Sequence, residues 1–334
     1  MKKNKVLIIA EAGVNHNGKI SLAKKLIEIA KKSGADYIKF QMFKTSDHVT
    51  KKAAQAKYQI RNLNKKTNQF DMIKKLEFNE KQFSEIQSYS KKKKIKFLAS
   101  CFDLKSVNNY SKFKPDFYKI PSGEITNLPL LEIIGKKNKK ILLSTGMAKM
   151  NEIQSAINIL IKNGCSLKNI TVLQCTTDYP CKISDVNLLV IPEIIQKFKC
   201  NVGFSDHTTS LDIANSAIAY GASIVEKHIT INNLLKGPDH KASLNPKDFK
   251  SFVNKIRVLE KAMGSSQKQP TENEKKNIYL VRKSIVAIKK IKKGEIFTRL
   301  NIGAKRPGNG ISPMKIYSFY GKKSKKNYEQ DEKL

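Results

Sequence analysis

The chain has 334 residues, of which 64 are Lys or Arg and 28 are Asp or Glu, so its formal net charge is +36. Only five arginines contribute to this excess, and the lysines are spread over predicted helices and loops. Nucleic-acid readers rely on arginine forks and on aromatic residues interleaved with basic ones, and neither pattern stands out here. We interpret the charge as a lysine-rich solvated surface and expect no nucleic-acid partner.

Neither a secretory signal nor a membrane span is expected. The first apolar run, Val6 to Ala10, follows a lysine-rich start but is interrupted by Glu11, and no small-residue cleavage site follows. No apolar run approaches the roughly 20 residues that span a bilayer. The five cysteines form no CxxC pair, which argues against a disulfide framework or a zinc site. We expect a cytoplasmic protein without contact to a membrane.

Eight short apolar runs occur in the first 228 residues, and each ends at polar or ionisable residues. In chain order, the runs and the residues that end them are Val6–Ala10 with Glu11, Tyr37–Ile38 with Lys39 and Gln41, Phe97–Ala99 with Ser100, Phe117–Tyr118 with Lys119, Ile141–Leu143 with Ser144, Ile170–Leu173 with Thr176 and Thr177, Val202–Phe204 with Ser205, Asp206 and His207, and Ile224–Val225 with Glu226, Lys227 and His228. Continuous apolar runs are typical of buried parallel strands. The sequence therefore predicts eight parallel strands.

Between these strands, apolar residues recur at helical spacing, for example over 22–30 and over 153–161. Strands alternating with helices predict an α/β fold, a (β/α)8 or TIM barrel, and the chain is long enough for this barrel and a small second domain. In such a barrel the carboxyl ends of all strands lie at one face. The polar residues that end the strands should therefore form a single site.

The segment between the second and third strands is long, and residues 51–69 are rich in Lys, Asn and Gln. A long connection over the face that holds the site is a candidate substrate lid. A disordered surface insertion has the same composition, and the sequence does not decide between these two interpretations.

The composition changes after the eighth strand. A helix is predicted from Pro246 to Met263, because Gly264 follows its last turn. A polar stretch comes next, and then short strands with Gly turns. We divide the chain into a barrel domain (1–264), a linker (265–280) and a small β-rich domain (281–334), which is too short to build much core of its own.

Two histidines end the seventh and eighth predicted strands, which are neighbours in a barrel, so His207 and His228 could reach one point above its mouth. Imidazole binds first-row divalent ions, and water and substrate oxygens would fill the remaining positions around Mn, Fe, Zn or Mg. Glu226 and Asp239 are close enough to be further ligands, to support the imidazoles or to carry protons. A lone His is more often structural, but two at adjacent strand ends favour a metal.

Lys39 and Lys119 end the second and fourth predicted strands, where a solvated surface lysine is not expected. Each could form a Schiff base or clamp an anion. The hydroxyls of Ser100, Ser122 and Ser144 favour a cradle for phosphate and carboxylate groups over a single imine site, although each serine alone could simply cap a strand end.

Glu11 ends the first strand, beside the expected metal. Its carboxylate could orient a hydroxyl group or move a proton. The following Asn17-Gly18 predicts a turn, in which we expect Gly18 to be structural.

Eight short motifs occur in order along nearly the whole chain. They are Ala10–Gly18, Lys39–Gln41, Lys119–Glu124, Ser144–Met147, Ser205–His207, Glu226–His228, Gly237–His240 and Lys305–Gly310. Together they resemble the bacterial N-acetylneuraminate (sialic acid) synthase family, which includes legionaminic acid synthases. The resemblance implies a TIM barrel followed by a small antifreeze-like (SAF) β-clip domain. It also implies a domain-swapped homodimer, in which this domain caps the partner's barrel.

The resemblance further implies a reaction. Members of the family condense phosphoenolpyruvate with an N-acylated mannosamine-type sugar, using Mn²⁺ or Mg²⁺, to give a nine-carbon 2-keto acid and phosphate with C–O cleavage. By this resemblance His207 and His228 hold the metal, and Arg306 reaches across the dimer to the acylamino group of the sugar. Roles in contacting the sugar or moving protons fall on Glu11, Tyr179, Glu226 and Asp239. Phosphoenolpyruvate is bound by Lys39, Ser100, Lys119, Ser122, Ser144 and Ser205, with Thr177 nearby.

Three positions depart from the family's pattern. Ser100-Cys101 stands where Thr-Pro is usual, Gln174 where His is common, and Tyr179-Pro180-Cys181-Lys182 where Tyr-Pro-Thr-Pro is more usual. These departures bear on the shape of the phosphoenolpyruvate pocket, and the reaction should be unchanged.

We expect an N-acetylneuraminate synthase that acts on N-acetylmannosamine. The alternative is a legionaminic acid synthase that uses 2,4-diacetamido-2,4,6-trideoxymannose, and the residues that decide should lie in 51–68 and near Arg306. Hypotheses from other classes are a lysine-rich barrel that binds nucleic acid, whose binding would fall steeply with salt, and a degenerate homologue without activity.

Overall fold

Eight parallel strands form a closed barrel in sequence order. The structure is a computed structural model that describes residues 5–64 and 67–334. The strands are β1 (Leu7–Gly13), β2 (Tyr37–Met42), β3 (Lys96–Cys101), β4 (Phe117–Ile120), β5 (Lys140–Ser144), β6 (Ile170–Cys175), β7 (Asn201–Asp206) and β8 (Ile224–His228). Each predicted apolar run is a strand, so the prediction of a (β/α)8 barrel is confirmed.

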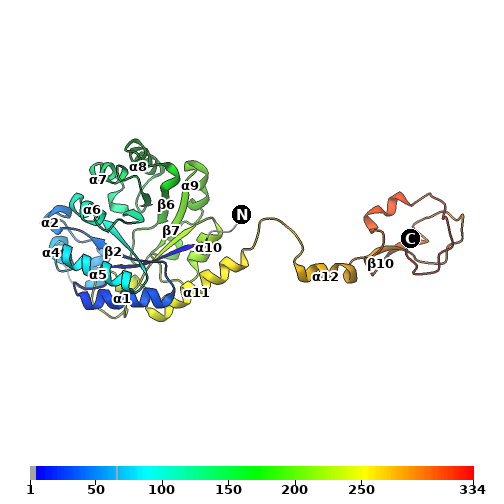
Figure 1. The fold of residues 1–334 in the computed structure, drawn as a ribbon, viewed down its shortest axis with the longest axis horizontal. Helices are drawn as coiled ribbons and strands as arrows, with labels where there is room; N and C mark the ends of the chain where they lie inside the picture. Colours follow the sequence, from blue (N-terminus) through cyan, green and yellow to red (C-terminus); the bar gives the residue numbers. More distant parts are fainter. Residues whose placement is uncertain (1–4, 65–66) are drawn as a thin grey trace. The chain divides into compact units, whose positions relative to one another are not determined.

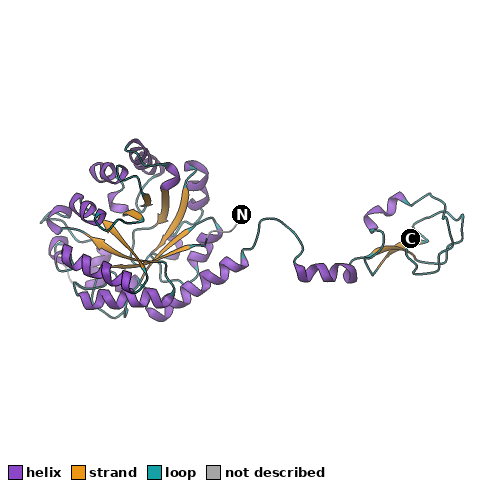
Figure 2. Cartoon of the chain, in the orientation of Figure 1, coloured by secondary structure: helices purple, strands orange, loops and turns teal. Residues whose placement is uncertain are grey.

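Helices surround these strands, as Figure 2 shows by the purple helices around the orange arrows. They are α1 (Ile20–Ser33), α2 (Thr45–His48), α3 (Lys57–Leu63), α4 (Gln69–Lys74), α5 (Glu80–Lys92), α6 (Leu104–Ser111), α7 (Leu128–Gly135), α8 (Met150–Lys162), α9 (Val190–Phe198), α10 (Ile213–Ala219) and α11 (Pro246–Ala262). In α1 the buried residues include Ala23, Leu26 and Ile27, which share one face of the helix. Gly34 then ends the helix with φ of 88°, a left-handed conformation that glycine adopts without strain.

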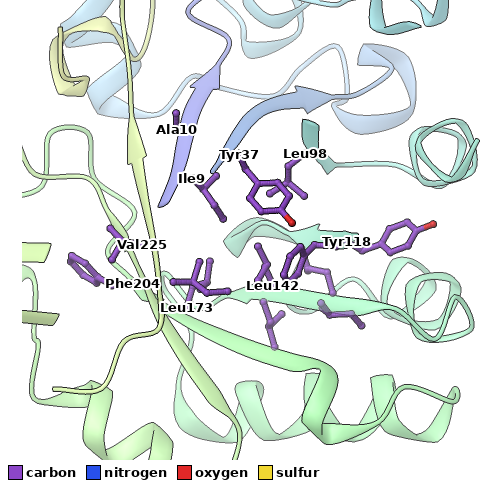
Figure 3. Packing of buried hydrophobic residues seen from close by; sticks show 14 of the residues in the cluster. Ile9, Ala10, Tyr37, Leu98, Tyr118, Leu142, Leu173, Phe204 and Val225 are labelled. Atoms are coloured by element: carbon purple, nitrogen blue, oxygen red, sulfur yellow. The ribbon is translucent and has the colours of Figure 1, made fainter. Parts of the chain in front are cut away.

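Apolar side chains fill the middle of the barrel. Ile9, Leu98 and Leu142 are buried and gather between the strands in Figure 3. Because successive residues of a strand point to opposite faces, the residues two positions further along share this interior. These residues are Glu11, Ser100 and Ser144. The interior therefore changes from apolar to polar toward the carboxyl ends of the strands, where barrel enzymes hold their active sites.

The connection between β2 and β3 contains α2, α3 and α4. Within residues 51–69, the side chains of Gln55, Gln59 and Asn62 are buried. Leu63 packs against a small apolar cluster that includes Phe43 and lies apart from the main core. The described part of this segment is therefore helical and packed, which favours the lid interpretation over a disordered insertion. Residues 65–66 lie outside the described residues.

The chain divides into two compact units, Met1–Met263 and Gly264–Leu334, and the second is orange to red in Figure 1. In the second unit β9 (Ser284–Ala287) pairs antiparallel with β10 (Ile302–Lys305), and a 3-10 turn covers Pro313–Ser318. A small core of its own is formed by Ile285, Ala287, Ile291, Phe297 and Ile302.

The segment that we expected to be a linker contains a helix, α12 (Glu272–Val281). Thr271 Oγ1 accepts a hydrogen bond from the Glu274 N–H (3.2 Å), and Glu274 Oε2 accepts one from the Thr271 N–H (2.7 Å). This reciprocal pair is a capping box, which starts a helix by satisfying two backbone donors. None of the helices within 5–64 and 67–334 has the length and hydrophobicity to span a membrane.

Candidate active site

A cavity opens at the carboxyl end of the barrel, and the residues that end the strands line it. Of the residues predicted from the sequence, the lining contains Glu11, Lys39, Ser100, Lys119, Ser122, Ser144, Thr177, Tyr179, Ser205, His207, Glu226 and His228. Asp239 and Arg306 are the two predicted site residues outside this lining.

Strand register explains why these residues meet. Glu11 of β1 is level with Lys39 of β2 and with His228 of β8. Ser100 of β3 is likewise level with Lys119 of β4. Residues that are level on neighbouring parallel strands point to the same side of the sheet. The closed barrel therefore brings side chains from distant parts of the chain into one layer.

Glu226 joins the two lysines at the centre of the cavity. Its Oε2 lies 2.7 Å from Lys39 Nζ, and its Oε1 lies 3.1 Å from Lys119 Nζ. Ser205 Oγ donates to Glu226 Oε1 at 2.9 Å, and Lys119 also donates to Ser144 Oγ at 2.7 Å. A single carboxylate thus holds both ammonium groups in place.

The charges of this cluster follow from its burial and its partners. Burial opposes ionisation of Glu226, but Lys119 and Lys39 hold its pKa well below the ordinary value. Burial also opposes the charge on Lys39, yet Glu11 and Glu226 raise its pKa. Burial lowers the pKa of Lys119 to about 8, although Glu226 acts in the other direction. At pH 7 the cluster therefore holds two cations around one anion.

Glu11 differs from Glu226 in both contacts and charge. Its Oε2 is buried without a hydrogen-bond partner among the described residues and lies 3.6 Å from Lys39 Nζ. Burial raises the pKa of Glu11 to about 7, although Lys39 lowers it. Burial likewise raises the pKa of Asp239 to about 7. A carboxyl with a pKa near 7 is suited to give or take a proton.

His207 and His228 lie next to each other in the lining of the cavity. Their ring centroids are 5.4 Å apart, and the ring of Tyr179 lies 4.2 Å from His207 and 5.5 Å from His228. His207 Nδ1 donates to the carbonyl oxygen of Thr176 at 2.6 Å, which leaves a lone pair on Nε2. Burial lowers the pKa of His207 to about 4, and burial moves the pKa of His228 in the same direction. Both imidazoles are therefore neutral at pH 7.

A divalent ion fits these two imidazoles. Metal ligation requires the neutral ring, and the hydrogen bond to Thr176 fixes the orientation of His207 as a supporting partner would. Nδ1 of His228 is buried without a hydrogen-bond partner among the described residues. Residues 5–64 and 67–334 contain no cluster of three or more His, Cys, Asp and Glu that could hold a metal. The chain would thus supply two ligands and leave the other positions open to water and substrate, as in catalytic sites.

Two further hydroxyls in the lining, those of Ser122 and Thr177, differ in their contacts. Ser122 Oγ accepts from the Gly146 N–H at 2.9 Å. Thr177 Oγ1 is buried without a hydrogen-bond partner among the described residues. A Cβ atom at position 146 would collide with this hydroxyl, so only glycine fits there. Thr177 is therefore a free donor that an incoming anion could use.

Several lining residues were not predicted individually, although some lie in the 51–69 segment or in the Ser144–Met147 motif. They are Phe43, His48, Tyr58, Gln59, Gln69, Ile73, Phe102 and Met147. Tyr58 and Gln59 come from α3, whose neighbour Asn62 donates to the carbonyl oxygens of Tyr179 (3.2 Å) and Pro238 (2.7 Å). Asn62 therefore ties α3 to the loops that follow β6 and β8, and it holds the segment over the cavity.

Asp239 and Arg306 have different surroundings. Asp239 is buried in the loop after β8, directly after the Pro238 that Asn62 contacts. Arg306 belongs to the second unit, where it is exposed and its Nε donates to the carbonyl oxygen of Val281 at 2.9 Å. The contact of Arg306 with a partner's barrel stays a prediction.

Comparison with known proteins places this site in a family. Residues 26–268 match the NeuB family, and residues 282–332 match the SAF domain. The chain belongs to the NeuB family. It is 51% identical over 328 residues to the N,N'-diacetyllegionaminic acid synthase of Campylobacter jejuni, with 98% of each chain covered.

Two further relatives share less of the sequence. The human N-acetylneuraminate-9-phosphate synthase is 36% identical over 335 residues, which cover 98% of this chain and 90% of that one. The crystal structure of the N-acetylneuraminic acid (sialic acid) synthetase from Leptospira borgpetersenii in complex with citrate has a TM-score of 0.73 and 31% identity, over 82% of this chain and 90% of that one. The predicted membership of the sialic acid synthase family is confirmed, and so is the SAF domain. This NeuB chain is an enzyme of the sugar-acid synthase type.

Proposed function

We propose that this enzyme condenses phosphoenolpyruvate with an N-acylated amino sugar to give a nine-carbon 2-keto acid and phosphate. The observation that carries this proposal is the cluster of Lys39 and Lys119 around the single carboxylate Glu226. Near pH 7 the carboxylate of Glu226 and a Glu11 that is only partly ionised leave part of the charge of the two buried lysines unbalanced, and a multiply charged anion such as phosphoenolpyruvate would balance it.

The lysines would hold the phosphate and carboxylate groups of phosphoenolpyruvate, and hydroxyls would complete the cradle. Thr177 offers an unused donor, and Ser100 also lines the cavity. Such binding fixes the enol carbon close to the mouth, where the aldehyde of the sugar would enter. Positioning of the two reactants accounts for a large part of the rate in reactions of this kind.

Proton transfer falls to Glu11 and Asp239 in this proposal. Glu226 is a weak base because two lysines stabilise its anionic form, so its role is to hold the lysines. Glu11 and Asp239 have pKa values of about 7. Glu11 lines the cavity and can deliver a proton to the aldehyde oxygen or take one from the water that adds to C2 before phosphate leaves. Asp239 lies outside the lining and would exchange protons with the site through a water molecule.

His207 and His228 would hold Mn²⁺ or Mg²⁺. When bound, the ion would polarise the carbonyl group of the open-chain sugar. Tyr179 packs against both imidazoles and would limit the directions from which the sugar approaches. Burial raises the pKa of Tyr179 well above its ordinary value, so its hydroxyl stays protonated and can only donate or accept a hydrogen bond.

The lining of the cavity bears on the choice of sugar. Phe43, Ile73, Phe102 and Met147 contribute apolar side chains to it, beside the polar His48, Gln59 and Gln69. 2,4-Diacetamido-2,4,6-trideoxymannose carries a methyl group at C6 and acetamido groups at C2 and C4. N-Acetylmannosamine has hydroxyl groups at C4 and C6 and an acetamido group at C2 alone. The apolar lining suits the first sugar better. Together with the 51% identity to a legionaminic acid synthase, it leads us to propose synthesis of N,N'-diacetyllegionaminic acid, with N-acetylneuraminate as the second candidate.

Arg306 enters this proposal through a second copy of the chain. As the family resemblance implies, we propose a cytoplasmic homodimer in which Arg306 of one copy contacts the acylamino group bound in the other barrel. An exposed guanidinium can donate several hydrogen bonds to an amide oxygen.

Phosphate release tests the proposed function and the acceptor together. The assay contains enzyme, Mn²⁺, phosphoenolpyruvate and either sugar, and a chelator should abolish release. We expect kcat/KM to be at least about tenfold higher for the diacetamido sugar, because a few apolar contacts contribute roughly this much discrimination. A preference for N-acetylmannosamine would overturn the choice of acceptor, and no release with either sugar would overturn the function.

A further inference from the structure

A buried ion pair lies on the other face of the two strands that carry the imidazoles. Asp206 and Lys227 directly precede His207 and His228, and they are level with each other across β7 and β8. Asp206 Oδ2 lies 2.7 Å from Lys227 Nζ, and both side chains are 0% exposed. Because adjacent strand residues point to opposite faces, this pair faces the helices. Lys227 Nζ accordingly lies 5.7 Å from the ring centroid of Phe252 in α11.

The pair also fixes the loop that leaves β7. Lys227 Nζ donates to the carbonyl oxygens of Thr208 (2.6 Å) and Ser210 (3.1 Å). Asp206 Oδ1 accepts from the Thr208 N–H at 2.8 Å. The backbone that directly follows His207 is therefore bound to one side chain from β7 and one from β8.

Stability alone does not account for charged residues at these positions. On β1 and β2 the residues level with Lys227, Ala10 and Ile38, are apolar and fully buried. A buried ion pair is generally no more stabilising than apolar residues of similar size, because both charges lose their hydration. An ion pair does make the pairing of the two strands more specific, since only one register of β7 and β8 brings the two charges together.

We propose that Asp206 and Lys227 are positioning residues that hold His207 and His228 at the spacing a divalent ion requires. On the inner face, the hydrogen bond from Ser205 to Glu226 joins the same two strands. The two strands are thus bound to each other on both faces, immediately before the imidazoles. This inference rests on the proposed function, because the metal is part of it.

Mn²⁺ binding to the double variant Asp206→Asn/Lys227→Met tests the inference. Neutral side chains of similar length leave no unpaired charge, so this variant should fold. Electron paramagnetic resonance of free Mn²⁺ gives the Kd for the metal. We expect this Kd to be about 10- to 100-fold higher in the variant than in the wild type, the usual loss of affinity when a supporting partner is removed. At saturating Mn²⁺, kcat should fall while the KM for phosphoenolpyruvate, held by β2 and β4, changes by less than about twofold.

Arg257→Met is the matched control. Arg257 pairs with Asp36 (3.0 Å) and Glu260 (2.7 Å) at the amino end of the barrel. Its loss should lower the melting temperature and leave Mn²⁺ affinity unchanged. If Arg257→Met weakens Mn²⁺ as much as the double variant does, the effect is general destabilisation and the inference is wrong.

Other outcomes separate the inference from the proposed function. A folded double variant with wild-type Mn²⁺ affinity overturns the inference and leaves the proposed function intact. If the double variant does not fold, Asp206→Asn/Lys227→Gln, which keeps a neutral donor beside a neutral acceptor and leaves no unpaired charge, replaces it with the same expected direction. If the wild type does not bind Mn²⁺, or if His207→Ala binds Mn²⁺ as tightly as the wild type, the metal site in the proposed function is wrong and the inference fails with it.

Discussion

The two ends of the barrel both carry charged clusters, but in different surroundings. At the carboxyl end, the side chains of Lys39, Lys119 and Glu226 are at most 4% exposed. At the amino end, Arg257 binds Asp36 and Glu260, and these side chains are about 20% exposed.

We attribute the difference in exposure to different roles, with the buried cluster serving function and the partly exposed cluster serving stability. Arg257 also donates to the carbonyl oxygen of Val6 at 2.9 Å, so the amino-end cluster joins α11 to the residue before β1. The carboxyl-end cluster costs more hydration and contains more positive than negative charge. Barrel enzymes keep chemistry at one end and stability at the other, and the predictions below test this division.

Loss of Lys119 should have the largest effect. Lys119→Ala removes one of the two cations that would face phosphoenolpyruvate, and we expect kcat/KM for phosphoenolpyruvate to fall about 10³-fold or more. Lys140→Ala is the control, since Lys140 is exposed at the start of β5, and its steady-state parameters should match the wild type. Equal losses in the two variants would contradict a specific role for the buried cluster.

Glu226→Gln should destabilise the free enzyme by about 3 kcal/mol, because Lys39 and Lys119 would then be buried without their shared carboxylate. Urea unfolding measures this loss. Inorganic phosphate should restore part of the stability of the variant and stabilise it more than the wild type. A variant as stable as the wild type without phosphate would show that the lysines do not need Glu226.

Glu11 should make stability depend on pH. Its pKa of about 7 in the folded state lies above the ordinary value of 4.5, so its contribution is present below pH 4.5 and is lost as the pH rises through 7. Relative to Glu11→Gln, the wild type should therefore lose about 2 kcal/mol between pH 5 and pH 8. Urea unfolding of both proteins at these two pH values checks the sign, and parallel pH dependences would contradict it.

Arg257→Met should have the smallest effect and act on stability alone. The pairs of Arg257 are partly exposed, so we expect the free energy of unfolding to fall by about 1 kcal/mol. Thermal unfolding and steady-state kinetics would measure both properties. A change in kcat/KM beyond about twofold would mean that the two ends are coupled and would break the division between them.

The sequence was sufficient for the residues at strand ends, because their signal is local. An apolar run followed by Lys119 or His207 needs no knowledge of the rest of the fold, and the closed barrel then brings such residues together. Tyr58 and Phe43 could not be found in this way. The place of Tyr58 depends on α3, which is held by contacts of Asn62 with residues 117 and 176 positions away. Phe43 directly follows β2, but an apolar residue there looks like ordinary core.

The charge states of the site carboxyls could not be predicted from the sequence either. Glu226 and Glu11 are both carboxyls at strand ends, and the sequence suggested proton transfer for each. Only their surroundings separate them, since Glu226 lies between two lysines and Glu11 has a buried oxygen without a hydrogen bond among the described residues. The helix α12 was not predicted, because its capping box of Thr271 and Glu274 directly follows Pro270 in a polar stretch. Such a stretch is typical of a linker.

Phosphate release from phosphoenolpyruvate, measured with and without 2,4-diacetamido-2,4,6-trideoxymannose, tests the central claim most directly. The claim is that one cavity holds the anion on Lys39 and Lys119 and the sugar beside His207 and His228. We predict release only when Mn²⁺ and both substrates are present, in equal amount to a nine-carbon 2-keto acid identified by mass. Release without a sugar, or none with either candidate sugar, would contradict it.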